Sequence, residues 1–160
     1  MLTDREWFLS SLAASVNIKK KIVEQDERDL GIRQILNFGH SIGHAIEQLS
    51  DYTVPHGQAV AIGMWVESYL SMSMGFLPAS DFRQIETSLQ MFHFSLKGTW
   101  LQDWEQVLHV LQLDKKNDAK ELRFVLLEGL GKPYKDYVFP ISREALKDAL
   151  QEYNHWIKQC

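Results

Sequence analysis

Cysteine is almost absent from the 160-residue sequence, in which Cys160 is the only one. An internal disulfide and a thiolate metal cluster are therefore both excluded. Long apolar runs are missing as well, since no segment carries the roughly 18 uninterrupted apolar residues that cross a bilayer. The first residues also lack the basic region and apolar core of a signal peptide. These absences predict a cytoplasmic protein with no membrane-spanning segment.

A surplus of positive charge is also lacking. The net charge is -4, with 17 Lys and Arg against 21 Asp and Glu, whereas non-specific nucleic-acid binding depends on excess cations that displace counterions from phosphates. Nucleic acid is therefore not an expected partner. With 45% hydrophobic and 24% charged residues, the composition is that of a globular chain, and its length predicts a single domain over residues 1–160.

The apolar periodicity predicts helices in the first third of the chain. Apolar residues recur at helical spacing over residues 8–23 and again over residues 32–49, with Gly39 and Gly43 inside the second segment. An interior glycine costs a helix about 1 kcal/mol relative to alanine. Two glycines four residues apart therefore indicate a close approach to the backbone, most simply by another helix.

The remaining residues continue this helical pattern. After a loop at residues 51–55, the very apolar segment 57–74 predicts a buried central helix. Two further helices are predicted at about 80–91 and 99–113, then a small β-hairpin formed by 122–127 and 137–139, then an amphipathic helix capped by Ser142. The expected fold class is therefore mainly α, a multi-helix domain with a small β-hairpin.

The densest group of chemically active side chains contains Asn37, His40, His44 and His56. His40 and His44 share a face if they lie on one helix, and this spacing lets two imidazoles bind one metal ion, as in the zinc-binding helix of metalloproteases. The glutamate that this motif requires is replaced by Ser41, which disfavours a metalloprotease. The pattern alone leaves two interpretations open, a metal site or histidines that are packed or exposed to solvent.

Polar residues near the histidines are consistent with an anionic substrate. Arg33 precedes Asn37 by one helical turn. A face shared by these two residues and the histidines would offer a guanidinium, an amide and imidazoles to a small substrate with hydroxyl, carboxylate or phosphate groups. The alternative is a solvated helix face, and the same two interpretations apply to the charged segments 19–21 and 114–118.

A longer set of residues matches the signature of a known family. The matching residues are Ile18-Lys19, Val23, Asp26-Glu27, Gly31, Arg33, Leu36-Asn37, Gly39-His40, Gly43-His44-Ala45, Glu47, His56-Gly57 and 59–64, followed by 114–116, 123–127 and 129–131. At these positions the chain resembles the 3-dehydroquinate synthases. The resemblance covers most of the chain and is strongest from Lys19 to Met64.

The resemblance implies the C-terminal domain of the dehydroquinate synthase-like fold, without the N-terminal NAD-binding domain that precedes it. Such enzymes convert 3-deoxy-D-arabino-heptulosonate 7-phosphate, a sugar-acid phosphate, into 3-dehydroquinate and phosphate in the shikimate pathway of aromatic amino-acid biosynthesis. Their cofactors are NAD and a divalent metal, zinc or cobalt, and they are commonly homodimers. The chain by itself is expected to be inactive.

Matched position by position, the resemblance implies that His40 and His56 are metal ligands and that His44 handles protons near the substrate. The family's third ligand is a glutamate that precedes the region matching Leu2. With two ligands in place of three, the chain is expected to bind zinc weakly. A tight affinity would indicate that another residue, such as Glu47, completes the site.

The resemblance also implies a set of substrate contacts. Asp26 matches an acidic residue that orients Lys19 or Arg33. Substrate binding is assigned to Lys19, Arg33, Asn37, His44 and one of Lys115 and Lys116, and the first four also to catalysis.

Two alternatives to this function stay open. A related sugar-phosphate cyclase, such as 2-deoxy-scyllo-inosose synthase, shares the metal-ligand scheme, although Arg33 and the segment 114–116 favour the shikimate substrate. A non-catalytic helical metal-binding module would keep the histidines for structure or metal storage.

Overall fold

The computed structural model describes residues 5–91, 98–113 and 122–159. The chain divides into two compact units, Met1–Leu36 and Asn37–Cys160, and each is described by itself. Within the described ranges, no helix is long and apolar enough to cross a bilayer. The single domain expected over residues 1–160 stays a prediction.

The first unit consists mainly of helix α1 (Arg5–Gln25), which confirms the helix predicted over residues 8–23. None of the residues of α1 is buried. A turn follows, and the short 3-10 helix η1 (Ile32–Asn37) then runs across the boundary between the two units.

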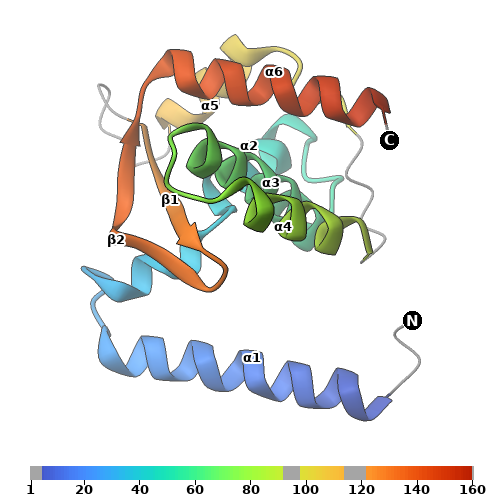
Figure 1. Cartoon of the computed structure of the whole chain (residues 1–160). Coiled ribbons are helices and arrows are strands. Elements are labelled where there is room, and N and C mark those ends of the chain that lie inside the picture. Colours follow the sequence, from blue (N-terminus) through green and yellow to red (C-terminus); the bar gives the residue numbers. More distant parts are fainter. Residues whose placement is uncertain (1–4, 92–97, 114–121, 160) are drawn as a thin grey trace. The chain divides into compact units, whose positions relative to one another are not determined.

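The second unit is built around helix α3 (His56–Ser73), which confirms the central helix predicted over residues 57–74. Apolar residues occupy most of its circumference, so neighbours cover it on several sides. Trp65, at its middle, contacts aromatic rings of α4 and α6. The elements packed on α3 are α2 (His40–Leu49), α4 (Ala79–Met91), α6 (Arg143–Gln159) and β1 (Leu122–Gly129) (Figure 1).

The predicted hairpin is also present. Strand β1 pairs antiparallel with β2 (Lys132–Ile141), and Leu122 lies opposite Ile141. The Ser142 hydroxyl accepts a hydrogen bond from the Ala145 N–H at 3.1 Å, which confirms the predicted cap of α6. Helix α5 (Trp104–Leu113) begins later than predicted, because the Asp103 carboxylate caps it by accepting the N–H groups of the second and third residues that follow.

The continuous helix predicted over residues 32–49 is wrong. Helix η1 ends at Asn37, Gly39 has a left-handed backbone with φ of 78°, and α2 begins at His40. Gly39 lies directly against α3, where an added Cβ would be 2.6 Å from the Val60 carbonyl oxygen and would overlap the Met64 backbone. The turn therefore depends on contact with α3, which local periodicity does not encode.

The close approach predicted at the two glycines is confirmed, and its partner is helix α3. A Cβ added to Gly43 would lie 3.1 Å from the Val60 Cα, so α2 and α3 pack with their backbones close together. Because η1 and α2 are separate helices, the single helical face predicted for Arg33, Asn37 and the histidines does not form.

Candidate functional site

Three of the predicted site residues meet in the second unit. His40 is the first residue of α2, His44 follows one turn later, and His56 is the first residue of α3. The ring centres are 5.3 Å apart for His40 and His56, 5.7 Å for His40 and His44, and 6.2 Å for His44 and His56. Two imidazoles bound to one tetrahedral zinc through Zn–N bonds of about 2.0–2.1 Å have centres about 5 Å apart. The spacing is therefore closest for His40 and His56, the predicted pair.

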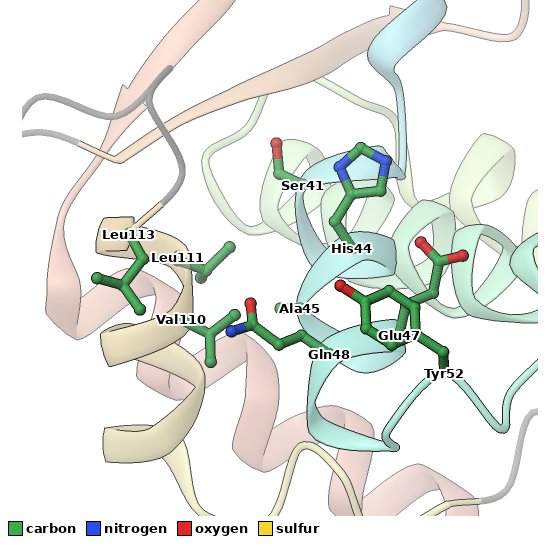
Figure 2. Close-up of a pocket in the computed structure, with 9 residues that line it drawn as sticks. All are labelled: Ser41, His44, Ala45, Glu47, Gln48, Tyr52, Val110, Leu111 and Leu113. Atoms are coloured by element: carbon green, nitrogen blue, oxygen red, sulfur yellow. The ribbon is translucent and has the colours of Figure 1, made fainter.

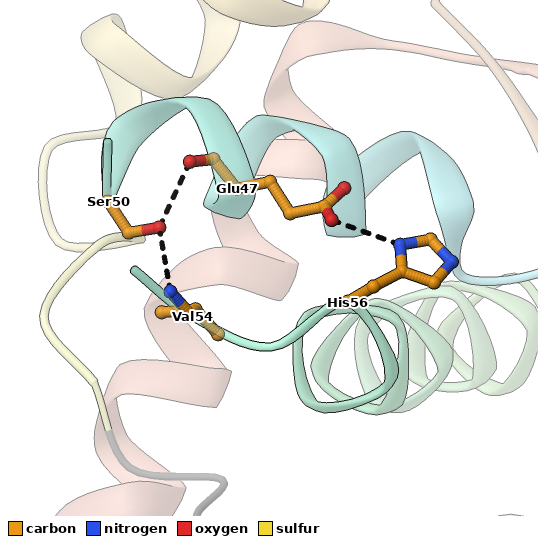
Figure 3. Close-up of polar contacts among 4 residues, drawn as sticks. All are labelled: Glu47, Ser50, Val54 and His56. Atoms are coloured by element: carbon orange, nitrogen blue, oxygen red, sulfur yellow. Dashed lines mark hydrogen bonds and ion pairs between the residues drawn. The ribbon is translucent and has the colours of Figure 1, made fainter. Parts of the chain in front are cut away.

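The turn between α2 and α3 brings His56 to this position. The Ser50 hydroxyl donates to the Glu47 carbonyl oxygen at 3.0 Å and accepts the Val54 N–H at 3.4 Å (Figure 3). The same Glu47 carbonyl accepts the Tyr52 N–H at 2.7 Å. These bonds hold the turn tightly against the end of α2. The Glu47 side chain and the His56 ring consequently face each other across it.

The three histidines differ in the hydrogen bonds of their ring nitrogens. Nδ1 of His40 donates to the Phe38 carbonyl oxygen at 3.2 Å, and Nδ1 of His56 donates to the Glu47 carboxylate at 3.0 Å. A carbonyl or carboxylate oxygen only accepts, so each bond places a proton on Nδ1 and makes Nε2 the ring nitrogen that can bind a metal. Metal-binding histidines are usually held in this way.

The His44 ring differs from the other two. His44 is exposed, and its nitrogens form no hydrogen bond to another residue of the described ranges. Its ring is therefore oriented by packing alone. Such a group is suited to exchange protons with a bound molecule, as the resemblance implies.

Glu47 is a candidate site residue that the sequence raised only as a possible further metal ligand. Its carboxylate, that of a half-buried side chain, accepts the His56 Nδ1 hydrogen (Figure 3). Ligand atoms of His44, Glu47 and His56 also lie within 4.8 Å of one another, which forms a second possible metal-ligating set. Because Glu47 already accepts from His56, the geometry favours a carboxylate that orients a metal ligand over one that binds the metal itself.

We expect Glu47→Ala to weaken zinc binding by the chain about tenfold, because the His56 ring loses the acceptor that orients it. Isothermal titration with a zinc salt measures the change. Glu47→Gln keeps an acceptor oxygen and should lose less. The exposed neighbour Gln48 serves as the control position, and Gln48→Ala should bind like the unaltered chain. A loss for Glu47→Ala equal to that for His56→Ala would instead identify Glu47 as a direct ligand.

A cavity of about 380 Å³ opens beside His44, between α2 and α5 (Figure 2). Its volume is in the range of small-molecule sites. The lining is polar along α2 and the following turn and apolar along α5. The lining residues are Ser41, His44, Ala45, Glu47, Gln48, Tyr52, Val110, Leu111 and Leu113.

Asp26 organises the turn that follows α1. Its carboxylate accepts backbone N–H groups of Leu30 at 3.2 Å, Gly31 at 2.8 Å and Arg33 at 3.1 Å. Burial would raise the pKa of Asp26, but these N–H groups and the Arg33 charge outweigh burial and hold the pKa below its usual value. Asp26 therefore orients the backbone of Arg33, whose guanidinium donates to the Glu27 carbonyl oxygen at 3.1 Å.

The other predicted substrate contacts lie in different parts of the chain. Lys19 is exposed on α1 and belongs with Arg33 to the first unit. Asn37 is half-buried at the end of η1. Lys115 and Lys116 lie outside the described residues. Their substrate roles stay predictions.

Comparison with known proteins identifies what the chain is similar to. Residues 1–117 match the family described as 3-dehydroquinate synthase C-terminal. The chain is 39% identical over 150 residues to the 3-dehydroquinate synthase of Thermodesulfovibrio yellowstonii, with 93% of this chain and 41% of the relative covered. It is 38% identical over 143 residues to that of Helicobacter pylori, with 88% and 40% covered.

Solved structures show the same fold. A 2-deoxy-scyllo-inosose synthase, complexed with carbaglucose-6-phosphate, NAD+ and Co2+, matches with a TM-score of 0.75 at 26% identity, over 86% of this chain and 38% of the other. A 2-epi-5-epi-valiolone synthase from Streptomyces hygroscopicus, with NAD+ and Zn2+ bound, matches with a TM-score of 0.80 at 19% identity, over 92% and 40%. The chain spans about two fifths of the length of each of these four proteins.

Proposed function

The chain belongs to the 3-dehydroquinate synthase family and matches the C-terminal domain of these enzymes. From this we propose that it forms the metal- and substrate-binding part of an enzyme that converts 3-deoxy-D-arabino-heptulosonate 7-phosphate into 3-dehydroquinate and phosphate. The observation that carries this proposal is the state of the three imidazoles. His40 and His56 each have Nδ1 occupied by an oxygen, as metal ligands do, while His44 lies unbonded at the edge of a cavity.

The donor set fits zinc or cobalt, because imidazoles that bind through Nε2 are ligands that both metals accept. His40 and His56 hold the ion in this proposal, and a glutamate from the part of the enzyme that precedes this chain completes the site. The chemistry that the bound groups supply is polarisation of a substrate oxygen by the metal and reversible oxidation of a substrate hydroxyl by NAD. Glu47 keeps the His56 ring in its binding orientation.

The remaining residues bind the substrate and move its protons. His44 takes up and returns a proton through a ring nitrogen at the edge of the cavity. Cations are suited to the phosphate and carboxylate of the substrate. The proposed contacts are Lys19, Arg33, Asn37 and one of Lys115 and Lys116. NAD is assigned to an N-terminal domain, and the whole enzyme to a cytoplasmic homodimer of the shikimate pathway, as the family resemblance implies.

The test is an assay of the chain joined to the N-terminal part of the Thermodesulfovibrio yellowstonii relative. With NAD and Co²⁺ present, we expect phosphate release and 3-dehydroquinate formation from 3-deoxy-D-arabino-heptulosonate 7-phosphate. The chain alone should release no phosphate. The matched control is the same fusion with His56→Ala, which should lose activity while still binding NAD. A fusion that binds NAD and metal yet forms no dehydroquinate would overturn the proposal.

A second candidate is a related cyclase. Two solved structures of 2-deoxy-scyllo-inosose synthase match the chain at 26% and 27% identity, so an enzyme with that activity has the same fold. The same fusion, assayed with the substrate of each enzyme, distinguishes the two. Turnover of the shikimate precursor alone supports the first proposal, and turnover of the other substrate alone supports the second.

A further inference from the structure

A carboxyl group lies at the centre of the fold and away from the cavity. Glu67, in the middle of α3, is fully buried. Its Oε2 accepts the Gly39 N–H at 2.8 Å, and Oε1 has no hydrogen-bond partner within the described ranges. Burial raises the pKa of Glu67 well above its usual value, although the Gly39 N–H acts in the opposite direction. Burying a carboxylate without a cation costs several kcal/mol, so this carboxyl group is a costly one to keep in the core.

The hydrogen-bond partner of Glu67 lies next to a proposed metal ligand. Gly39 immediately precedes His40, and its carbonyl is so close to α3 that a Cβ added to Gly63 would overlap it. The turn at residues 38 and 39 therefore lies closely against α3, and its contacts include the Glu67 carboxyl and the bare Cα of Gly63.

Helix α3 thus determines the positions of both proposed metal ligands. It carries His56 as its first residue, and through Glu67 it holds the turn from which His40 extends. Displacement of that turn along or away from α3 would move His40 relative to His56. The 5.3 Å between their rings consequently depends on a bond formed in the core.

We propose that Glu67 is a positioning residue, whose hydrogen bond to the Gly39 N–H fixes the turn before His40 and so sets the spacing of His40 and His56. The inference rests on the proposed function, since it assigns these two histidines to the metal. An apolar side chain of similar size would occupy the same space without the cost of burying a carboxyl group. What the carboxyl supplies, and an apolar side chain does not, is an acceptor for the Gly39 N–H.

Zinc titration of the whole chain, together with amide hydrogen exchange at Gly39, tests this role. Glu67→Gln keeps an acceptor oxygen in a side chain of the same shape, and its zinc dissociation constant should stay within about threefold of the original. Glu67→Met fills the space without an acceptor. It should bind zinc about tenfold more weakly, the range for residues that orient metal ligands, and it should lose the slow exchange of the Gly39 amide.

Two controls separate positioning from loss of stability. Leu70→Ala lies one turn further along α3 in the core and should lower stability without changing zinc affinity or Gly39 exchange. Ser68→Ala removes another fully buried polar group of α3 and should leave both unchanged. If Glu67→Met binds zinc like Leu70→Ala, or if Glu67→Gln loses as much as Glu67→Met, the proposal is wrong.

A wrong assignment of the metal ligands would give a different result from a wrong role for Glu67. If His40→Ala leaves zinc binding unchanged, the proposed metal pair is wrong, whatever the Glu67 variants do. The exchange rate of the Gly39 amide would then still decide whether Glu67 holds the turn, because it does not depend on the metal.

Discussion

Gly63→Ala is expected to lower the free energy of unfolding by about 3 kcal/mol, the upper end for an overpacked core. The added Cβ would overlap the carbonyl group of Gly39, which is backbone and cannot rotate away as a side chain would. Either α3 or the turn before α2 has to move. Since small domains are stable by only about 5–15 kcal/mol, urea denaturation would show a clear decrease in the midpoint.

Gly57→Ala is the matched control on the same helix. A Cβ at Gly57 would meet no atom within 4 Å, so alanine should add its higher helix propensity, up to about 1 kcal/mol, at no steric cost. Opposite signs for the two variants would show that the effect at Gly63 comes from close contact with Gly39. Equal stability of Gly63→Ala and the unaltered chain would contradict the backbone contact between α3 and the turn.

The elements that the sequence predicts correctly are those with a local signal. The central helix follows from an apolar segment too long and too uniform for a surface helix, and the hairpin from two short apolar runs around a glycine-rich turn. Ser142 marks the start of the last helix through its own hydroxyl. In each case the residues that determine the structure lie within a few positions of it.

The break between η1 and α2 has no such signal. Apolar residues continue at helical spacing through it, and the left-handed conformation of Gly39 is held by Val60, Gly63 and Glu67, which follow more than 20 residues later. The family resemblance predicted that His40 pairs with His56 at the metal. Spacing alone favours His40 with His44. The Glu47 oxygen that accepts from His56 depends on the packing of α2 against α3, whereas the Phe38 oxygen that accepts from His40 depends on the turn before α2.

Alanine variants of the three clustered histidines are expected to divide into two classes in zinc binding. His40→Ala and His56→Ala each remove one of two proposed ligands, so affinity should fall by more than about 100-fold, beyond the range for residues that only orient ligands. His44→Ala should bind zinc within about threefold of the unaltered chain, because its ring is assigned to proton transfer. Isothermal titration with zinc and the thermal shift in excess zinc measure both classes.

The exposed histidines His109 on α5 and His155 on α6 supply the control, since their alanine variants test for adventitious zinc binding by surface imidazoles. Neither should alter the affinity. A large loss for His44→Ala together with no loss for His40→Ala would replace the proposed pair by the set of His44, Glu47 and His56. The His40 result therefore decides between the two sets, because His56 belongs to both. His40 belongs only to the pair with His56, the pair whose spacing Glu67 is proposed to set through the turn before α2.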